Sequence, residues 1–274
     1  MEFKAIKMDG LGNDFLIIDQ RTEHINLSND QIVKICDRKF LGCDQLIFIK
    51  KDSNSDAGLE FYNSDGSKSG ACGNGTRCVA YFISKEKNKE QIVFKTQSGI
   101  LKSKVLGNKI VETNIGAPKF SWKEIPLKKE TDNTNLGITI SGRDGISLTG
   151  GYALSVGNPH LIFFVNKIEN FDLSKIGPGL EVHPIFPKKC NVTLAEIINN
   201  KLIKVKVWDR GAGMTKACGT AACATAVAAF KKKLVQDIVD IQFELGVITI
   251  TIDKNHFIHM KGEVSEIKEI DIKI

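Results

Sequence analysis

The sequence lacks the patterns that mark several specialised classes of protein. No apolar run approaches the roughly 20 residues that cross a bilayer, and the alternating residues 1–7 lack the apolar core of a signal peptide. The net charge is +6, but the lysines are scattered, and no arginine-rich stripe with interleaved aromatics occurs. These features disfavour a nucleic-acid partner. We therefore expect a cytoplasmic protein that acts neither in a membrane nor on nucleic acid.

The seven cysteines follow neither a disulfide framework nor a zinc pattern. Their number is odd and no export signal precedes them, which favours reduced thiols. Structural zinc sites usually contain Cys-x-x-Cys pairs. Here Cys72 and Cys78 are six positions apart, and Cys218 and Cys223 are five apart. We expect no metal site, and the sequence contains no motif for an organic cofactor.

A short phrase that begins Ala-Cys-Gly occurs twice and reveals an internal duplication. Cys72-Gly73-Asn74 lies in the first half, and Cys218-Gly219-Thr220 follows it by 146 positions. Further matches fall in the same order at this offset or one residue less. The matched pairs are Asn13 with Asn158, Gln45 with Asn191, Asn63 with Asp209, and Gly116 with Gly262.

Each half is expected to contain strands, one central helix and then further strands. Helices are expected after the two Cys-Gly pairs, over residues 76–87 and 220–233. This order differs from the βαβα alternation of a Rossmann fold. We therefore predict an α+β protein with two pseudo-symmetric lobes, 1–117 and 118–262, each a β-sheet wrapped around its central helix. The expected strands include 46–50, 59–62, 92–96, 110–113, 192–198, 202–208, 241–244 and 247–252.

The repeated cysteines suit proton transfer at a stereocentre. A thiol that precedes a helix meets unpaired backbone N–H groups and the positive end of the helix dipole. Such a position can lower a cysteine pKa from about 8.5 to ~3.5–7.5. We predict that Cys72 and Cys218 face each other across one pocket, so that one thiolate removes a proton while the other thiol delivers one. The helix N-termini would stabilise negative charge on a substrate carboxylate.

The remaining repeated positions suit a substrate that carries both ammonium and carboxylate groups. Amides can donate and accept hydrogen bonds, and a guanidinium binds carboxylates. His160 follows Asn158 and Pro159 and is expected to line the same site. The expected ligand-binding residues are Asn13, Gln45, Asn63, Asn158, Asn191, Asp209 and Arg210.

Together these motifs resemble those of the diaminopimelate epimerase family over nearly the whole chain. The resemblance implies an isomerase that interconverts LL- and meso-2,6-diaminopimelate without a cofactor, on the route to lysine and peptidoglycan. The matching motifs are Gly12-Asn13-Asp14-Phe15, Asn63-Ser64-Asp65-Gly66-Ser67, Cys72-Gly73-Asn74-Gly75-Thr76-Arg77-Cys78, Gly157-Asn158-Pro159-His160, Arg210-Gly211-Ala212-Gly213 and Ala217-Cys218-Gly219-Thr220.

The resemblance also implies a role for each site residue. Cys72 and Cys218 would be the acid–base pair, and two lobes would close over the substrate in the cleft between them. The last strand, 263–274, would return to the first lobe, and a homodimer is suggested by the resemblance alone. Backbone N–H groups of Gly73, Asn74, Gly219 and Thr220 would bind the reacting carboxylate, Asn63, Asn158, Asn191 and Arg210 would hold the distal end, and Asn13 and Gln45 would line the pocket.

The chain departs from the family pattern at two positions. The family usually has Glu where this chain has Asp209, and often Glu where it has Met214. The shorter Asp209 could weaken a contact with a substrate ammonium. One alternative is a proline-racemase-like enzyme, but such enzymes typically have His where this chain has Asn74. The other is a non-catalytic amino-acid-binding relative, which the presence of both Cys-Gly pairs disfavours.

Overall fold

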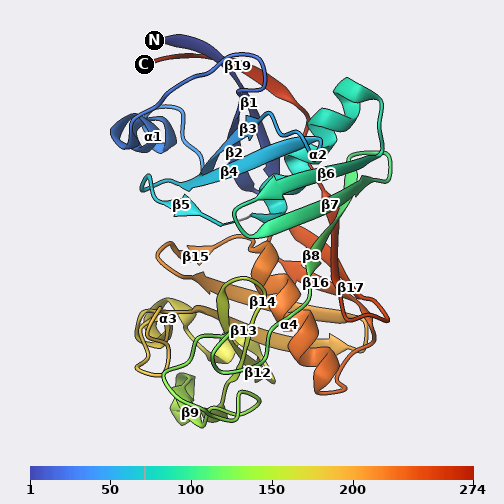
Figure 1. Cartoon of the computed structure of the whole chain (residues 1–274). Helices are drawn as coiled ribbons and strands as arrows, with labels where there is room; N and C mark the ends of the chain where they lie inside the picture. Colours follow the sequence, from blue (N-terminus) through green and yellow to red (C-terminus); the bar gives the residue numbers. More distant parts are fainter. Residues whose placement is uncertain (71) are drawn as a thin grey trace. The chain divides into compact units, whose positions relative to one another are not determined.

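The structure is a computed structural model that describes residues 1–70 and 72–274. Ala71, the first residue of the first repeated phrase, lies outside the described residues. Contacts divide the chain into two compact units (Figure 1). The first unit contains Met1–Ile115 and Lys261–Ile274, and the second contains Gly116–Met260.

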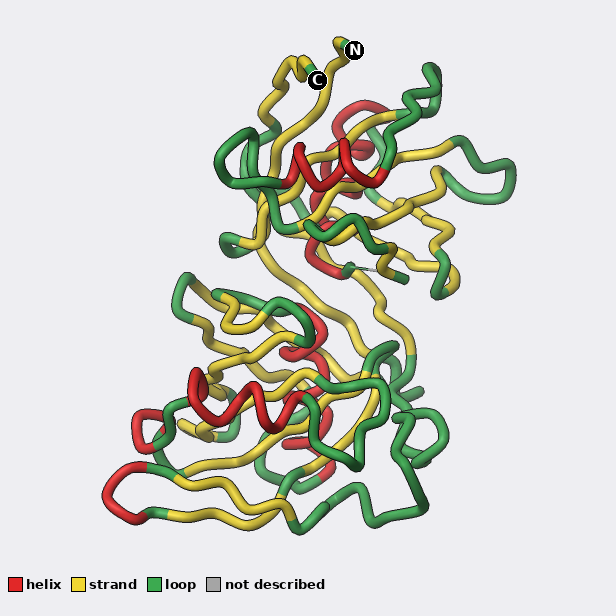
Figure 2. The backbone as a smooth tube through the Cα atoms, turned by 90° about the vertical axis from the view of Figure 1, so that its left-hand side faces the viewer, coloured by secondary structure: helices red, strands yellow, loops and turns green. Residues whose placement is uncertain are grey.

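The first unit is a mixed sheet that wraps around helix α2. The helix packs against four of the strands, β1, β2, β6 and β7. β1 also pairs antiparallel with β19 from the far end of the chain, so the termini lie side by side (Figure 2). The elements of this unit are β1 (Glu2–Gly10), β2 (Asn13–Asp19), α1 (Asn29–Cys36), β3 (Gln45–Lys50), β4 (Ala57–Asn63), β5 (Lys68–Ser69), α2 (Gly73–Lys87), β6 (Gln91–Thr96), β7 (Gly99–Val105), β8 (Ile110–Gly116) and β19 (Lys268–Lys273).

The second unit has a sheet of the same kind around helix α4, which packs against β11, β12, β13, β16 and β17. A two-stranded hairpin, β9 with β10, stands apart from that sheet. β18 crosses the boundary between the units. The elements are β9 (Ile138–Ser141), η1 (Arg143–Gly145), β10 (Ser147–Gly150), β11 (Tyr152–Ser155), β12 (Pro159–Val165), η2 (Ile168–Asn170), α3 (Leu173–Glu181), β13 (Asn191–Asn199), β14 (Leu202–Asp209), β15 (Gly213–Thr215), α4 (Gly219–Lys231), β16 (Ile238–Phe243), β17 (Gly246–Ile252) and β18 (Ile258–Glu263).

The strand pairing repeats from one unit to the other. β2 runs parallel to β3, β3 antiparallel to β4, and β4 parallel to β6. In the second unit β12 runs parallel to β13, β13 antiparallel to β14, and β14 parallel to β16. The central helix follows the strand pair β4–β5 or β14–β15 in both units. This repeat confirms the predicted fold class, an α+β protein formed by internal duplication.

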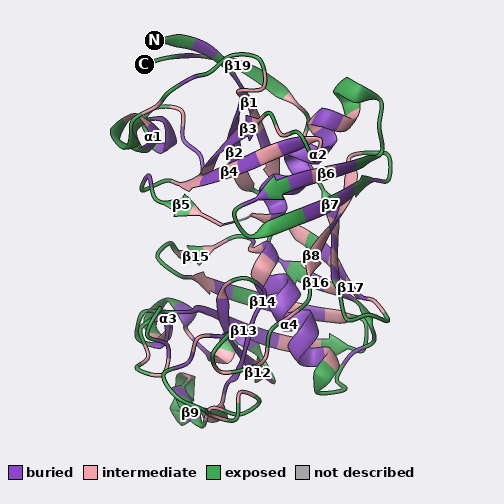
Figure 3. Cartoon of the chain, viewed as in Figure 1, coloured by how far each residue is buried: buried purple, intermediate pink, exposed green. Residues whose placement is uncertain are grey.

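Small residues allow both central helices to lie close to their sheets. A Cβ atom on Gly75 would stand 2.6 Å from Ile47 Cδ1, so α2 comes nearer to β3 than alanine permits. In α4 the run from Ala221 to Ala229 is buried on every side (Figure 3). Such a helix gains its stability from burial within the sheet rather than from one apolar face. The tight packing fixes where each helix begins, which is where the cysteines lie.

Helix α3 was not predicted from the sequence. It contains Gly177 and Pro178, residues that usually interrupt helices. Tertiary packing explains the glycine, since a Cβ atom there would stand 2.7 Å from the Trp208 ring. Among residues 1–70 and 72–274, no helix is both long and apolar enough to span a bilayer.

Candidate active site

Each unit places one thiol at the start of its central helix. Cys72 is the N-cap of α2, and its Sγ atom accepts the backbone N–H of Gly75 at 3.4 Å. Cys218 is the N-cap of α4, and its Sγ atom lies 3.4 Å from Thr220 Oγ1. The backbone angles agree closely, with φ −140° and ψ 115° at Cys72 and φ −140° and ψ 111° at Cys218. The two thiols therefore share a backbone geometry but have different partners.

In the first unit the structure brings the predicted amide residues together around the start of α2. Asn74 Nδ2 donates to Asn13 Oδ1 at 3.2 Å, which joins the helix to the start of β2. Gln45 Nε2 donates to Asn63 Oδ1 at 2.8 Å, and these two residues face each other on antiparallel strands. Asn63 Nδ2 in turn donates to Ser67 Oγ at 3.0 Å. The amides form two hydrogen-bonded pairs, one between α2 and β2 and one between β3 and β4.

One of these amides, Asn13, also contacts a charged side chain, Asp44, whose role was not predicted from the sequence. Asp44 Oδ2 accepts Asn13 Nδ2 at 2.8 Å and the backbone N–H of Asp14 at 3.1 Å. Arg38 bridges the two carboxylates, donating to Asp14 at 2.8 Å and to Asp44 at 2.6 Å. The sequence signal was available, since Asp44 directly precedes Gln45 in the same motif.

In the second unit the predicted residues again meet at the helix start. Asn158 Nδ2 donates to Thr220 Oγ1 at 3.3 Å, and Asn158 Oδ1 lies 3.0 Å from His160 Nε2. Asn191 Nδ2 donates to the carbonyl oxygen of Pro159 at 3.0 Å. His160 and Asn191 are register partners on the parallel strands β12 and β13. A chain of hydrogen bonds therefore runs from His160 through Asn158 and Thr220 to the Cys218 thiol.

Arg210 lies beside this cluster and keeps its side chain exposed. Its backbone N–H donates to Asn191 Oδ1 at 3.0 Å, and its Nη1 donates to the carbonyl oxygen of Lys188 at 3.1 Å. The preceding Asp209 accepts Thr215 Oγ1 on Oδ2 at 2.6 Å. Met214, the other departure from the family pattern, is exposed. The exposed guanidinium is placed to bind an anion.

The environment of Cys218 favours its protonated form. Desolvation by burial raises the pKa of Cys218 well above its ordinary value, and the Asp209 carboxylate raises that pKa further. The Thr220 hydroxyl and the backbone N–H of Ala221 act in the opposite direction but are weaker. At neutral pH, therefore, Cys218 has the properties of a proton donor.

His160 is completely buried and stays neutral. Desolvation lowers the pKa of His160 to about 3, and the positive charge of Arg210 adds to this effect. Because Asn158 Oδ1 can only accept, His160 Nε2 carries the proton and donates it. The nitrogen of the same amide donates to Thr220 Oγ1. His160 thus contacts the cluster through its hydrogen bond with Asn158.

A further residue that sequence reasoning missed supports the turn that carries Arg210. Glu181, at the end of α3, is buried and accepts Trp208 Nε1 at 2.7 Å and the backbone N–H of Gly211 at 3.1 Å. Lys189 Nζ lies 3.5 Å from the same carboxylate. No sequence signal indicated this role, because it depends on the unpredicted helix.

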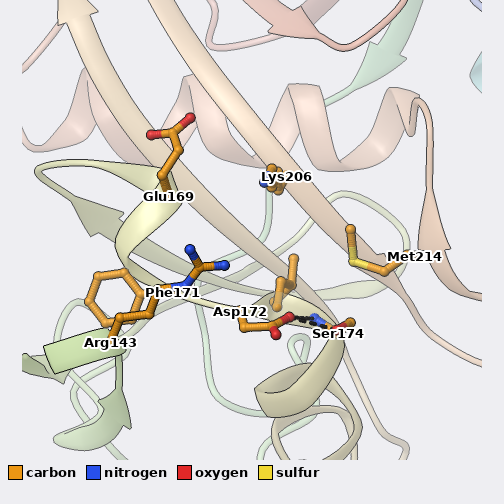
Figure 4. Close-up of a pocket in the computed structure, with 8 residues that line it drawn as sticks. Arg143, Glu169, Phe171, Asp172, Ser174, Lys206 and Met214 are labelled. Atoms are coloured by element: carbon orange, nitrogen blue, oxygen red, sulfur yellow. Dashed lines mark hydrogen bonds between the residues drawn. The ribbon is translucent and has the colours of Figure 1, made fainter. Parts of the chain in front are cut away.

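A cavity of about 200 Å³ opens elsewhere on the second unit (Figure 4). None of the predicted site residues lines it, although Met214 from β15 lies at one side of it, opposite Arg143 and Phe171. The cavity is lined by Arg143, Glu169, Phe171, Asp172, Leu173, Ser174, Lys206 and Met214. Within residues 1–70 and 72–274, no cluster of three or more His, Cys, Asp or Glu side chains could hold a metal ion.

Comparison with known proteins agrees with the duplicated architecture. The family model described as diaminopimelate epimerase matches residues 5–121 and 152–267. A protein from Pelagibacter ubique named diaminopimelate epimerase is 64% identical over 274 residues, which cover 100% of both chains.

Two solved structures share the fold at low identity. One, from Pseudomonas aeruginosa, is described as a predicted epimerase, with a TM-score of 0.71, 12% identity and coverage of 99% of this chain and 100% of that one. The other is a probable proline racemase from Agrobacterium radiobacter, with a TM-score of 0.70, 10% identity and coverage of 99% and 93%. The family model spans most of the chain and the Pelagibacter relative spans all of it, so the chain belongs to the diaminopimelate epimerase family.

Proposed function

We propose that this chain interconverts LL- and meso-2,6-diaminopimelate without a cofactor. The observation that carries the proposal is the pair of thiols, one at the N-terminus of the matching helix in each duplicated half. Amide side chains lie beside both helix starts. The full-length 64% identity to a relative named diaminopimelate epimerase supports the same substrate.

The reaction is a transfer of protons at one carbon. In one direction, the Cys72 thiolate forms an S–H bond as the substrate Cα–H bond breaks, and the electron pair remains on the carbon and its carboxylate. Cys218 then gives its thiol proton to the opposite face and becomes a thiolate. This assignment follows from the contacts, because Cys72 accepts a backbone N–H, whereas burial and Asp209 keep Cys218 protonated. In the reverse direction the roles exchange.

The remaining residues bind the two ends of the substrate. Backbone N–H groups at both helix starts stabilise the carboxylate on which negative charge grows. Arg210 binds the distal carboxylate, and Asp209, one methylene shorter than the usual Glu, lies next to the thiol that it keeps protonated. The proposed binding set is Asn13, Gln45, Asn63, Gly73, Asn74, Asn158, Asn191, Asp209, Arg210, Gly219 and Thr220.

We place the activity in the cytoplasm. We assign one lobe to residues 1–117 with 263–274 and the other to residues 118–262.

We also propose a homodimer, which sedimentation analysis of the purified chain would test. A single species with the mass of one chain would contradict the dimer.

An isotope-exchange assay tests the proposed reaction. The purified chain, without added cofactor, is incubated with LL-2,6-diaminopimelate in deuterated water. We expect the meso isomer to form with deuterium at the inverted α-carbon. Inversion of proline without any action on diaminopimelate would favour the proline-racemase-like alternative. Binding of diaminopimelate without exchange would identify a non-catalytic relative.

A further inference from the structure

The Asn13 amide has one hydrogen-bond partner on each side. Its nitrogen donates to Asp44 Oδ2 at 2.8 Å, and its oxygen accepts Asn74 Nδ2 at 3.2 Å. An amide can turn over and exchange its donor and acceptor sides. Asp44 decides between the two orientations, because a carboxylate bound to the Arg38 guanidinium has no proton to donate. The nitrogen of Asn13 must therefore face Asp44.

We propose that Asp44 is a positioning residue that sets the direction of the Asn13 and Asn74 side-chain amides beside Cys72, and so makes this part of the site an acceptor of a substrate ammonium group. The inference deepens the proposed function and rests on it. It concerns Asp44, which does not itself belong to the proposed binding set. Its effect passes through Asn13 to Asn74, the second residue of α2.

The direction of the hydrogen bonds decides which atoms remain for a ligand. The nitrogen of Asn74 is used on Asn13, and the nitrogen of Gln45 is used on Asn63. Within the described residues, Asn74 Oδ1 and Gln45 Oε1 are buried and accept no hydrogen bond. Asn74 is only 2% exposed, so its oxygen has little access to solvent. A buried acceptor without a donor is costly unless a ligand supplies one.

An ammonium group supplies such donors, since it carries N–H groups and no acceptor. A carboxylate would instead place its own oxygens against amide oxygens. If Asn13 turned over, Asn74 would have to turn as well, and its nitrogen would then face the ligand. The Asp44 carboxylate therefore determines whether this part of the site accepts an ammonium group or repels it.

The test compares Asp44→Asn with Asp14→Asn. Both changes remove one carboxylate from the Arg38 bridge, but only Asp44 contacts the Asn13 side chain. We expect Asp44→Asn to raise KM for diaminopimelate about ten-fold or more, with kcat changed by less than about three-fold, because ground-state binding is what it removes. Asp14→Asn should leave KM within about two-fold. Equal increases in KM for both variants would overturn the proposal and leave only a structural role for the Arg38 bridge.

Two further measurements test separately whether the effect of Asp44 passes through Asn13 and whether the ligand group is an ammonium. In the Asn13→Ala background, Asp44→Asn should raise KM no further, since the amide through which it acts is gone. An unchanged ten-fold effect in that background would contradict the route through Asn13. Pimelate, the same dicarboxylate without ammonium groups, should inhibit Asp44→Asn and the unchanged chain with inhibition constants that agree within about two-fold. An equal loss of pimelate inhibition would contradict the ammonium assignment.

Failure of this inference differs from failure of the proposed function. If the unchanged chain does not exchange the α-hydrogen of diaminopimelate, the proposed function fails. If the unchanged chain is active and Asp44→Asn behaves like Asp14→Asn, only the inference about Asp44 fails.

Discussion

The starts of the two central helices have nearly the same backbone but place their thiols in different surroundings. The N-cap angles of Cys72 and Cys218 differ by only 4° in ψ. Beside Cys72 the Asn13 amide donates to the Asp44 carboxylate, whereas beside Cys218 the Asn158 amide is hydrogen-bonded to a neutral histidine. At the position that matches Asp209, the first unit has the uncharged Asn63.

This comparison shows which part of a duplication stays symmetric. The backbone geometry is shared because both thiols must stand at the positive end of a helix. The side-chain partners differ because, in any one direction, one thiol begins as a base and the other as an acid. Asp209 and burial raise the pKa of Cys218 and so establish that difference in the second unit.

The largest expected effect is the loss of activity when either thiol is removed. We expect Cys72→Ala and Cys218→Ala each to lower the rate of diaminopimelate epimerisation by ~10²–10⁴-fold, the usual contribution of a positioned acid or base. Chiral chromatography of the two isomers measures the rate. Cys78→Ala, in the buried interior of α2, is the matched control and should remain active. Full activity in either thiol variant would contradict the two-base mechanism.

Loss of Glu181 should damage the second unit more than any equivalent surface change. Glu181→Ala leaves the half-buried Trp208 Nε1–H and the Gly211 N–H without their acceptor. We expect the free energy of unfolding to fall by about 1–3 kcal/mol, the cost of leaving one largely desolvated donor without an acceptor, because water can reach the Gly211 N–H. Denaturant unfolding followed by tryptophan fluorescence measures the loss. Glu181→Gln, which keeps one oxygen, should be milder, and an equal loss in both would argue against these bonds.

His160 gives the stability of the second unit a dependence on pH. Its folded pKa of about 3 lies below the ordinary 6.5, so the unfolded chain takes up the proton first as pH falls. Stability should therefore decline from about pH 6.5 towards pH 3, with a slope of up to about 1.4 kcal/mol per pH unit. Unfolding curves at several pH values should show that His160→Gln loses this part of the slope. Identical slopes would contradict the buried neutral histidine.

The smallest expected effect is a shift in the pH at which the Cys218 thiol ionises. Asp209→Asn removes the negative charge that helps to raise the pKa of Cys218, so the thiolate should form at lower pH. Iodoacetamide labelling in a Cys72→Ala background, read by mass spectrometry across pH, follows this change. Asp172→Asn, a carboxylate of the same unit at the N-cap of α3, serves as control. A labelling curve that does not move would show that Asp209 leaves the thiol unaffected.

Most of the predictions about the fold came from the sequence motifs, because the residue types in those motifs have few alternative structural roles. A cysteine and a glycine before a run of small residues predict a helix start, and α2 and α4 begin at Gly73 and Gly219. Helix α3 could not be predicted, because Gly177 and Pro178 oppose a helix locally, and tertiary packing such as that of Gly177 against Trp208 compensates. The roles of Asp44 and Glu181 were not predicted for a related reason, because they depend on hydrogen-bond partners that are distant in sequence.

By itself, the sequence determined the duplication, the α+β architecture and the place of Cys72 and Cys218 at two helix starts. These follow from periodic patterns and from local backbone chemistry, which depend on neighbouring residues. Only the tertiary structure decided the direction of the amide hydrogen bonds, the neutral state of His160 and the raised pKa of Cys218. Those properties depend on burial and on charges brought close by the fold, such as Asp209 beside the thiol. The repeat thus specifies two equivalent thiols, and the packing around them makes them chemically different.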